Sequence, residues 1–527
     1  MHSLDGGPPH PDLAMLAVRL AEGSIGRRSF LRHAAWLGAA VPIAACGNAP
    51  LPSNDRLRFV CSVQAIPDPA LSAWVEAANL YRNVLEFLTD VDADNIVRPA
   101  LAQSWRPSDD LRTWTFTLQP GVRWSNGDPL TTADIGFNIA RWLAPASNSV
   151  NRTALAAIAS FEAIDELRFA LHLSRPVCAL PEQLNSATCA ILHRDFDRHG
   201  GKWTDVPIGT GPYRLTNFEV GREARLERRE DYWGQAARLR HLDFIDLGPD
   251  VTTHVAALAA GQVDVLYRIG VSELDLIERL PNALLLRHAS ATTLCIRMKT
   301  AVQPFDDIRV RRAVQLAADN DAMLRLAHRG HGSLADHHHV SASQPDFGDL
   351  ARQPRDVAGA RVLLDEAGYA NGIDLELVLG NTTGRWEQDV AQVLQQNLAE
   401  AGIRLALRVV PATEYWSVWD KVPFGMTSWG HRPLGIMTLD LGYRSGSSWN
   451  ESGFADPHFD ALLDTAMGIL DPVARGVVMA AAQARLRDAA VMVQPFWPEK
   501  FTAVSPRVRG HVLHPSDYFR LDQVWLT

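Results

Sequence analysis

The chain has 527 residues, of which 47% are hydrophobic and 21% charged, and its formal net charge is −9 at pH 7. This length exceeds one typical hydrophobic core and predicts an ordinary globular protein of two or three domains. The acidic balance argues against nucleic-acid binding, because phosphate contacts need a basic surface. No run of 18 apolar residues occurs, so the sequence predicts no transmembrane helix.

The first segment of the chain has the pattern of an export signal. Arg27, Arg28 and Arg32 precede residues 34–45, twelve residues without a charge. As a helix this run would cover about 18 Å, short of the ~30 Å hydrocarbon core of a bilayer. It is therefore typical of the apolar part of a signal peptide. The arginine pair, followed by Ser-Phe-Leu, resembles the twin-arginine export signal.

The apolar run ends in Ile-Ala-Ala-Cys, which resembles the lipobox of bacterial lipoproteins. In such proteins the cysteine becomes the new N-terminus and carries the lipid. We therefore expect residues 1–45 to be a twin-arginine-type lipoprotein signal peptide and Cys46 to be the site of lipid attachment. An ordinary secretory signal cut near Ala45 is the alternative. Both place the mature protein outside the cytoplasm.

Beyond the leader, the spacing of apolar residues predicts a mixture of strands and helices. Strands are expected at residues 57–63, 113–118, 263–267 and 403–409. Helices are expected at residues 72–88, from 132 onward, and at 251–260, 357–367 and 387–401. Three aspartates are placed to cap helices, namely Asp250, Asp356 and Asp456. The mixture predicts an α/β chain of more than one lobe, with a hinge near residues 294–305.

After the leader four cysteines remain, and none has the CxxC spacing of a zinc or redox site. Export makes a disulfide possible, and Cys178 and Cys189 are close enough in sequence to close a small loop. The alternative is that Cys61, Cys178, Cys189 and Cys295 are all small buried hydrophobic residues.

Four blocks of sequence resemble one known family. The first, residues 101–142, contains "LAQSW", "SDD" and "TWTFTLQPGVRWSNGDPLTTADI"; the others are residues 207–234, 305–321 and 454–464. In this order they resemble the family 5 extracellular solute-binding proteins. These are the dipeptide-, oligopeptide- and nickel-binding receptors of ATP-driven (ABC) importers.

The resemblance implies a two-lobe α/β fold of the periplasmic-binding-protein type (class II, large type). Lobe I would comprise residues 46–295 with an extra subdomain at about 90–205, and lobe II residues 296–498. Residues 499–527 would return to lobe I. The resemblance also implies a monomer without cofactor or enzymatic activity. It would bind a small molecule in the interlobe cleft, close about a hinge and deliver the ligand to the membrane permease.

The candidate ligand-binding segment departs from the pattern of the family. In the peptide-binding members, a strand carries a tryptophan followed within a few residues by an aspartate that receives the peptide's ammonium group. Here Trp429 is followed by Gly-His-Arg, and no acid occurs before Asp440. This argues against simple α-amino recognition. Histidine and arginines favour a carboxylate-bearing ligand, because arginine offers a paired donor fork.

The candidate ligand-binding residues are Trp429, His431, Arg444, Trp449 and Arg385. Arg385 precedes a helix, at a point where related dipeptide receptors place a carboxylate-binding arginine. Arg444 has the alternative role of a surface ion-pair partner, and Trp449 that of core packing. Tyr443 and Arg432 are secondary candidates.

Three adjacent histidines, His337, His338 and His339, favour an alternative function as a metal or metal-chelate (nickel-type) receptor on the same fold. Adjacent side chains do not all converge without an unusual loop, so a plain loop is the competing interpretation. A third class, an exported hydrolase, has little support, because neither G-x-S-x-G nor H-E-x-x-H occurs.

Overall fold

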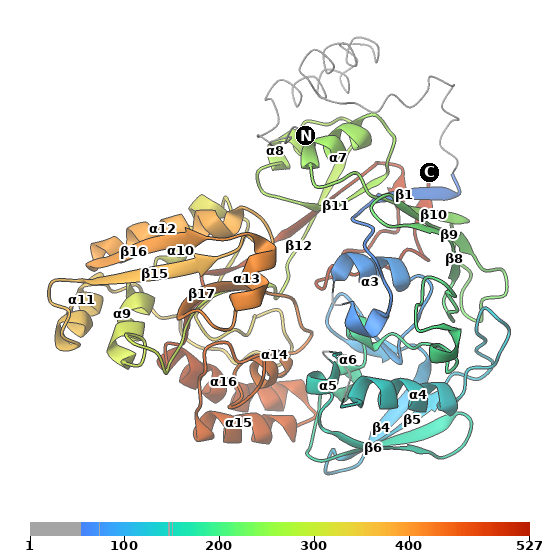
Figure 1. Cartoon of the computed structure of the whole chain (residues 1–527), viewed down its shortest axis with the longest axis horizontal. Helices are drawn as coiled ribbons and strands as arrows, with labels where there is room; N and C mark the ends of the chain where they lie inside the picture. Colours follow the sequence, from blue (N-terminus) through green and yellow to red (C-terminus); the bar gives the residue numbers. More distant parts are fainter. Residues whose placement is uncertain (1–53, 73, 146–147, 150) are drawn as a thin grey trace, which may run out of the picture.

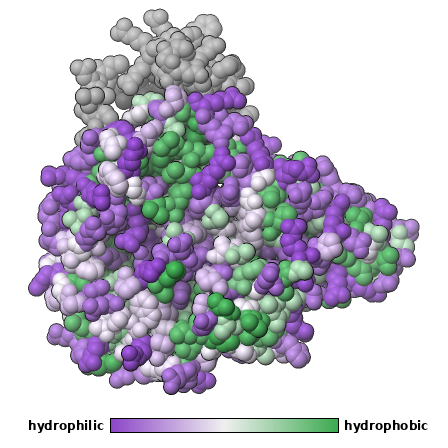
Figure 2. Space-filling model, turned by 180° about the vertical axis from the view of Figure 1, so that it is seen from behind, coloured by the Kyte–Doolittle hydropathy of each residue, from purple (hydrophilic) through white to green (hydrophobic). Residues whose placement is uncertain are grey.

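The computed structural model describes residues 54–527 except 73, 146–147 and 150, so the signal segment and Cys46 lie outside the described residues. The chain forms two lobes (Figure 1). The opposite face is mainly hydrophilic, with hydrophobic side chains gathered in smaller patches (Figure 2). No helix of the described part is long and apolar enough to cross a membrane.

The first lobe is built on a seven-stranded sheet. Its order is β12 (Leu284–His288), β20 (Lys500–Val504), β11 (Val265–Ile269), β1 (Arg56–Val60), β10 (His241–Ile245), β9 (Glu223–Arg228) and β8 (Tyr213–Glu219). Helices α7 (Val251–Ala259) and α8 (Leu274–Glu278) lie near β11 and β12, and α3 (Val75–Tyr81) lies toward the other lobe in Figure 1. Strand β1 runs parallel to both of its neighbours, β10 and β11.

A four-stranded antiparallel sheet extends the first lobe. Its order is β4 (Ala102–Pro107), β5 (Thr113–Leu118), β7 (Arg168–Leu173) and β6 (Ile158–Ala163). Helices α4 (Thr132–Leu143), α5 (Asn151–Ala154) and α6 (Leu180–Gln183) accompany it. The start of α4 is fixed by a reciprocal capping box between Thr131 and Asp134.

The second lobe contains a five-stranded sheet. Its order is β16 (Ile403–Val409), β15 (Ile373–Leu379), β17 (Phe424–Trp429), β13 (Thr293–Met298) and β18 (Met492–Val493). Its first helices are α9 (Ile308–Ala317), α10 (Asn320–Ala327), α11 (Val357–Glu366), α12 (Trp386–Glu400) and α13 (Ala412–Val418). Below them in Figure 1, on the side of α5 and α6, lie α14 (Gly435–Gly442), α15 (Pro457–Met467) and α16 (Pro472–Asp488).

The chain crosses between the lobes twice. It leaves the first lobe at residues 289–292, between β12 and β13, and returns after β19 (Phe496–Pro498), which pairs with β14 (Gly332–Leu334). The hinge was expected near residues 294–305, and the observed crossing lies a few residues before that range. Every residue of β13 is buried, so its apolar pattern does not indicate which sheet it joins.

The helix expected at residues 72–88 is shorter in the structure, because the chain after Tyr81 packs against a pair of glycines. The amide of Gly211 donates to the carbonyl of Val84 at 2.9 Å. A Cβ at Gly209 would lie only 2.0 Å from the same oxygen. These glycines of the family-like block therefore permit close backbone packing.

The cysteines of the described part are free and buried, including Cys178 and Cys189. Cys189 lies beside Asn151, while Cys178 lies beside the carbonyl of Ala466. These cysteines are therefore small buried residues, as the alternative interpretation held. The structure contains no disulfide between Cys178 and Cys189.

Candidate ligand-binding site

The two lobes touch at several points of the structure. Asn95, in the turn between β2 (Thr89–Val91) and β3 (Val97–Pro99), donates from Nδ2 to the carbonyl of Ser343 at 3.1 Å. The amide of Cys178 donates to the carbonyl of Met467 in α15 at 3.0 Å. Apolar side chains of both lobes also form one continuous core cluster. The structure thus shows the lobes in contact with each other.

His431 is one of the residues that join the lobes. Its Nδ1 accepts from the amide of Ala291, in the crossing segment, at 3.0 Å, and its Nε2 lies 2.7 Å from Oδ1 of Asn95. Burial holds the pKa of His431 well below its ordinary value, so the ring is neutral and Nε2 is the donor. Both nitrogens are therefore occupied by protein in this arrangement, and neither is available to a ligand.

Trp429 ends strand β17 and is only 4% exposed. Its Nε1 donates to the buried carboxylate of Glu451 at 2.8 Å. That carboxylate also accepts from Thr427 Oγ1 at 2.7 Å and from Arg297 Nε at 3.2 Å. Trp429 is therefore held rigidly. Because it is almost completely buried, it packs beneath other residues and does not itself line an open cavity.

A row of tryptophan rings leads from Trp429 toward the surface. The ring of Trp449 lies 5.8 Å from that of Trp429, and the ring of Trp419 lies 6.2 Å from that of Trp449. The guanidinium of Arg432 lies over this row, 5.4 Å from the ring centre of Trp429 and 5.9 Å from that of Trp449. Trp449 is half-buried, so it packs in the aromatic row and still keeps an accessible edge.

Arg444 does not face a free anion site. Its Nε contacts Asp440 at 2.5 Å and its Nη1 contacts Asp464 at 2.9 Å. Asp440 also pairs with Arg175 of the first lobe at 2.8 Å. Two carboxylates thus neutralise Arg444, and the ion-pair alternative describes it better than ligand binding.

Arg385 is exposed at the start of α12, and its side chain forms no hydrogen bond or ion pair within the part of the chain that the structure describes. The buried carboxylate of Glu387 fixes the preceding loop by accepting from the amides of Thr382 and Thr383 at 2.8 and 2.9 Å. Glu387 also accepts from Ser428 Oγ at 2.9 Å, next to Trp429. This arrangement ties the loop that precedes Arg385 to residue 428 of β17.

The three adjacent histidines are buried and point to different partners. His337 Nδ1 accepts from the amide of Gln494 at 2.9 Å, and His339 Nδ1 hydrogen-bonds the hydroxyl of Tyr443 at 2.7 Å. Burial lowers the pKa of His337 and of His338 to about 4. Among residues 54–527, the masked positions apart, no group of three His, Cys, Asp or Glu side chains is arranged to hold a metal ion.

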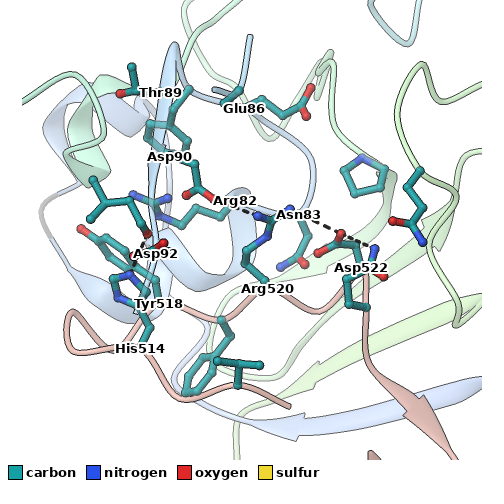
Figure 3. A pocket seen from close by; sticks show the side chains of 18 of the residues that line it. Arg82, Asn83, Glu86, Thr89, Asp90, Asp92, His514, Tyr518, Arg520 and Asp522 are labelled. Atoms are coloured by element: carbon teal, nitrogen blue, oxygen red, sulfur yellow. Dashed lines mark hydrogen bonds and ion pairs between the residues drawn. The ribbon is translucent and has the colours of Figure 1, made fainter. Parts of the chain in front are cut away.

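A cavity of about 480 Å³ lies in the first lobe, lined by parts of residues 82–119, 212–235 and 510–523. Arg82 stacks on the ring of Tyr518 at 3.7 Å. Figure 3 shows Arg520 between Asp90 and Asp522, with which it forms ion pairs of 2.8 and 3.6 Å. The second lobe contributes nothing to this lining, so the cavity is not an interlobe site.

Arg432, a secondary candidate in the sequence, has few protein partners. Its one hydrogen bond within the described chain joins Nη1 to the carbonyl of Gly430 at a long 3.4 Å, and no carboxylate pairs with it. The signal was present in the sequence, because the segment from Trp429 to Asp440 contains no acid. No pattern in the sequence indicates that Arg432 lies over the tryptophan row.

Two α/β lobes joined by crossing strands, with aromatic rings and unpaired arginines near the junction, define a two-lobe binding protein of the type II periplasmic class. The chain belongs to the bacterial extracellular solute-binding proteins, family 5, whose middle-region model matches residues 97–446. This confirms the resemblance seen in the sequence. The chain is accordingly a substrate-binding receptor of an ABC importer, acts outside the cytoplasm and is not an enzyme.

Individual relatives bind different ligands. Glutathione-binding protein GsiB of Pectobacterium atrosepticum is 26% identical over 522 residues, covering 93% of this chain and 98% of the relative. Heme-binding protein A of Haemophilus influenzae is 25% identical over 481 residues, covering 83% and 85%. Among solved structures, AgaA of A. tumefaciens in complex with agropinic acid has a TM-score of 0.77 at 23% identity, covering 89% and 96%.

Proposed function

We propose that this receptor captures a small carboxylate-bearing solute, a peptide or a modified amino acid, between its two lobes and delivers it to its permease. The observation that carries this proposal is the exposed guanidinium of Arg385, which has no partner within the described residues and follows a loop that Glu387 ties to Ser428 of β17. A guanidinium offers paired donors that match a carboxylate. The relatives that bind glutathione and agropinic acid are consistent with an acidic ligand.

We also propose that twin-arginine export delivers the protein, that Cys46 carries a lipid and that the mature chain is a monomer. The residue pattern of the leader supports the first two statements. The metal-receptor alternative gains no support from the described histidines, since each is buried with a protein partner.

Native mass spectrometry of the protein purified from its own host tests these proposals together. We expect a monomer that carries a lipid on Cys46 and releases a small acidic molecule on unfolding. A mature mass without lipid would contradict lipid attachment alone. Failure to retain cargo or to bind any member of a library of peptides and organic acids would contradict the proposed ligand class.

Arg385→Ala should weaken binding of the retained cargo by about 1.5–3 kcal/mol, the usual worth of a hydrogen bond to a charged group. Isothermal titration calorimetry measures the change. Arg325→Ala is a matched control, because Arg325 lies on α10 with its side chain 65% exposed. Equal affinity of the Arg385 variant and the parent would remove Arg385 from the site.

Asn95→Gly should shift the ligand-free protein toward a more open shape. The change removes both side-chain hydrogen bonds across the lobes, each worth about 0.5–1.5 kcal/mol. Glycine is the suitable replacement because Asn95 has a φ of 62°. Small-angle scattering should show a larger radius of gyration, and Asp94→Gly in the same turn should leave it unchanged. An unaltered radius in the Asn95 variant would contradict a role in lobe contact.

A further inference from the structure

The guanidinium of Arg432 differs from those of its neighbours in having no acidic partner. Arg297, Arg444 and Arg175 lie in the same region, and each contacts at least one carboxylate at 3.2 Å or less. For Arg432 the described chain offers only the faces of two tryptophan rings and the distant carbonyl of Gly430. Four or more of its N–H donors therefore have no strong protein acceptor.

Arg432 is half-buried, so N–H groups without a protein acceptor remain accessible to solvent or to a ligand. Burial lowers the pKa of Arg432 to about 10, and the ring of Tyr518, across on the first lobe, acts in the opposite direction. Contact with aromatic faces recovers part of the lost hydration. It does not supply the directional acceptors that a carboxylate would supply.

Arg432 is also held in place more firmly than an ordinary surface arginine. Its carbonyl accepts from Gln344 Nε2 at 2.8 Å, and the preceding His431 is bonded on both ring nitrogens. Three residues further on, the amide of Gly435 donates to the buried carboxylate of Asp346 at 2.7 Å. That carboxylate is itself paired with Arg475 at 3.3 Å, so it is not a hidden partner of Arg432.

We infer that Arg432 is a second anion-binding residue of the interlobe site, in addition to Arg385, and receives a carboxylate or a similar oxyanion of the ligand. This inference rests on the proposed function. The anion would accept the free N–H groups, while Trp429 and Trp449 keep the guanidinium plane in position. The tryptophan row beside it would pack against the less polar part of the same ligand. A solute with only cationic groups does not fit this site.

The test compares acids with their esters. Probes are reduced glutathione and N-succinyl-dialanine, each as the free acid and as the full methyl ester, together with the cargo released from the parent chain. Binding is followed by tryptophan fluorescence and by calorimetry. We expect the parent to bind free acids at least about tenfold more tightly than esters. Arg432→Met should lower this ratio several-fold, the remainder being due to Arg385, and Arg432→Lys should lower it less.

Arg325→Met is the matched control, because it removes the same charge from the exposed face of α10. Thermal unfolding verifies that the Arg432 variants remain folded. An undiminished acid-to-ester ratio in Arg432→Met, or a cargo without any anionic group, would overturn the role of Arg432 and leave the receptor function intact. A parent chain that binds neither cargo nor any probe would overturn the proposed function as well.

Discussion

Asp517→Asn is expected to lower the free energy of unfolding by about 3–5 kcal/mol, as removal of one partner from a buried ion cluster does. The side chain of Asp517 is 5% exposed and contacts the ammonium of Lys500 and Arg268 Nη2, the latter at 3.4 Å. Lys500 begins β20 and His288, 3.5 Å from Asp517, ends β12. The variant would leave the half-buried ammonium of Lys500 without its carboxylate near the point where the chain crosses between lobes.

The loss of unfolding free energy in Asp517→Asn should depend on pH. Burial acts to raise the pKa of Asp517, but the charges of Lys500 and Arg268 outweigh it and hold this pKa well below its ordinary value. A carboxyl with a depressed folded-state pKa stabilises the protein above its unfolded pKa, about 3.9, and loses that contribution as pH falls below it. The difference between parent and variant should therefore be constant near neutral pH and shrink in acid.

Urea unfolding at pH 7 and at successively lower pH measures both effects. Asp321→Asn serves as the control, because that side chain is 71% exposed on α10 and its ion pair spans a long 3.6 Å. A loss below about 1 kcal/mol at pH 7 would mean that the cations relax to solvent and that the cluster does not hold the crossing strands.

Glu451→Gln should destabilise the second lobe by a similar amount, about 3–5 kcal/mol, because it leaves Arg297 without its counter-charge. Arg297 lies on β13 and its side chain is only 2% exposed. Burial raises the pKa of Glu451, and the positive charge of Arg297 opposes this effect. The variant should also weaken ligand binding, since Glu451 anchors the indole under Arg432.

Chemical unfolding gives the stability change, and calorimetry with the retained cargo gives the binding change. Glu414→Gln, at an exposed position of α13, is the matched control. Normal stability combined with weak binding would separate the anchoring role from the structural one. Normal values of both would refute the importance assigned to this carboxylate network.

Much of the fold follows from local signals in the sequence. Strands β5 and β16 and helix α11 begin where alternation or a capping aspartate predicts. The crossing between lobes was misplaced, because the fully buried β13 has no polar face to show its surroundings. The order of strands in the two large sheets depends on distant pairings, such as β1 with β10, that no local pattern encodes.

The site was harder to predict than the fold. The ion pair of Arg444 was visible in principle, because Asp440 precedes it by four residues in a helical register. The hydrogen bond between His431 and Asn95 joins positions 336 residues apart, and no local sequence pattern around either residue predicts it. Arg432 differs from both. The sequence shows that no acid is near it, but only the structure shows that it packs on two tryptophan rings.

The place of β20 in the first sheet has a consequence for synthesis of the protein. This strand lies between β11 and β12 and pairs with both, although it begins only at Lys500. The ribosome must therefore release nearly the whole chain before β12 gains its single neighbour in that sheet. A nascent chain halted at residue 499 would expose two unpaired strand edges, which makes late truncations prone to aggregation.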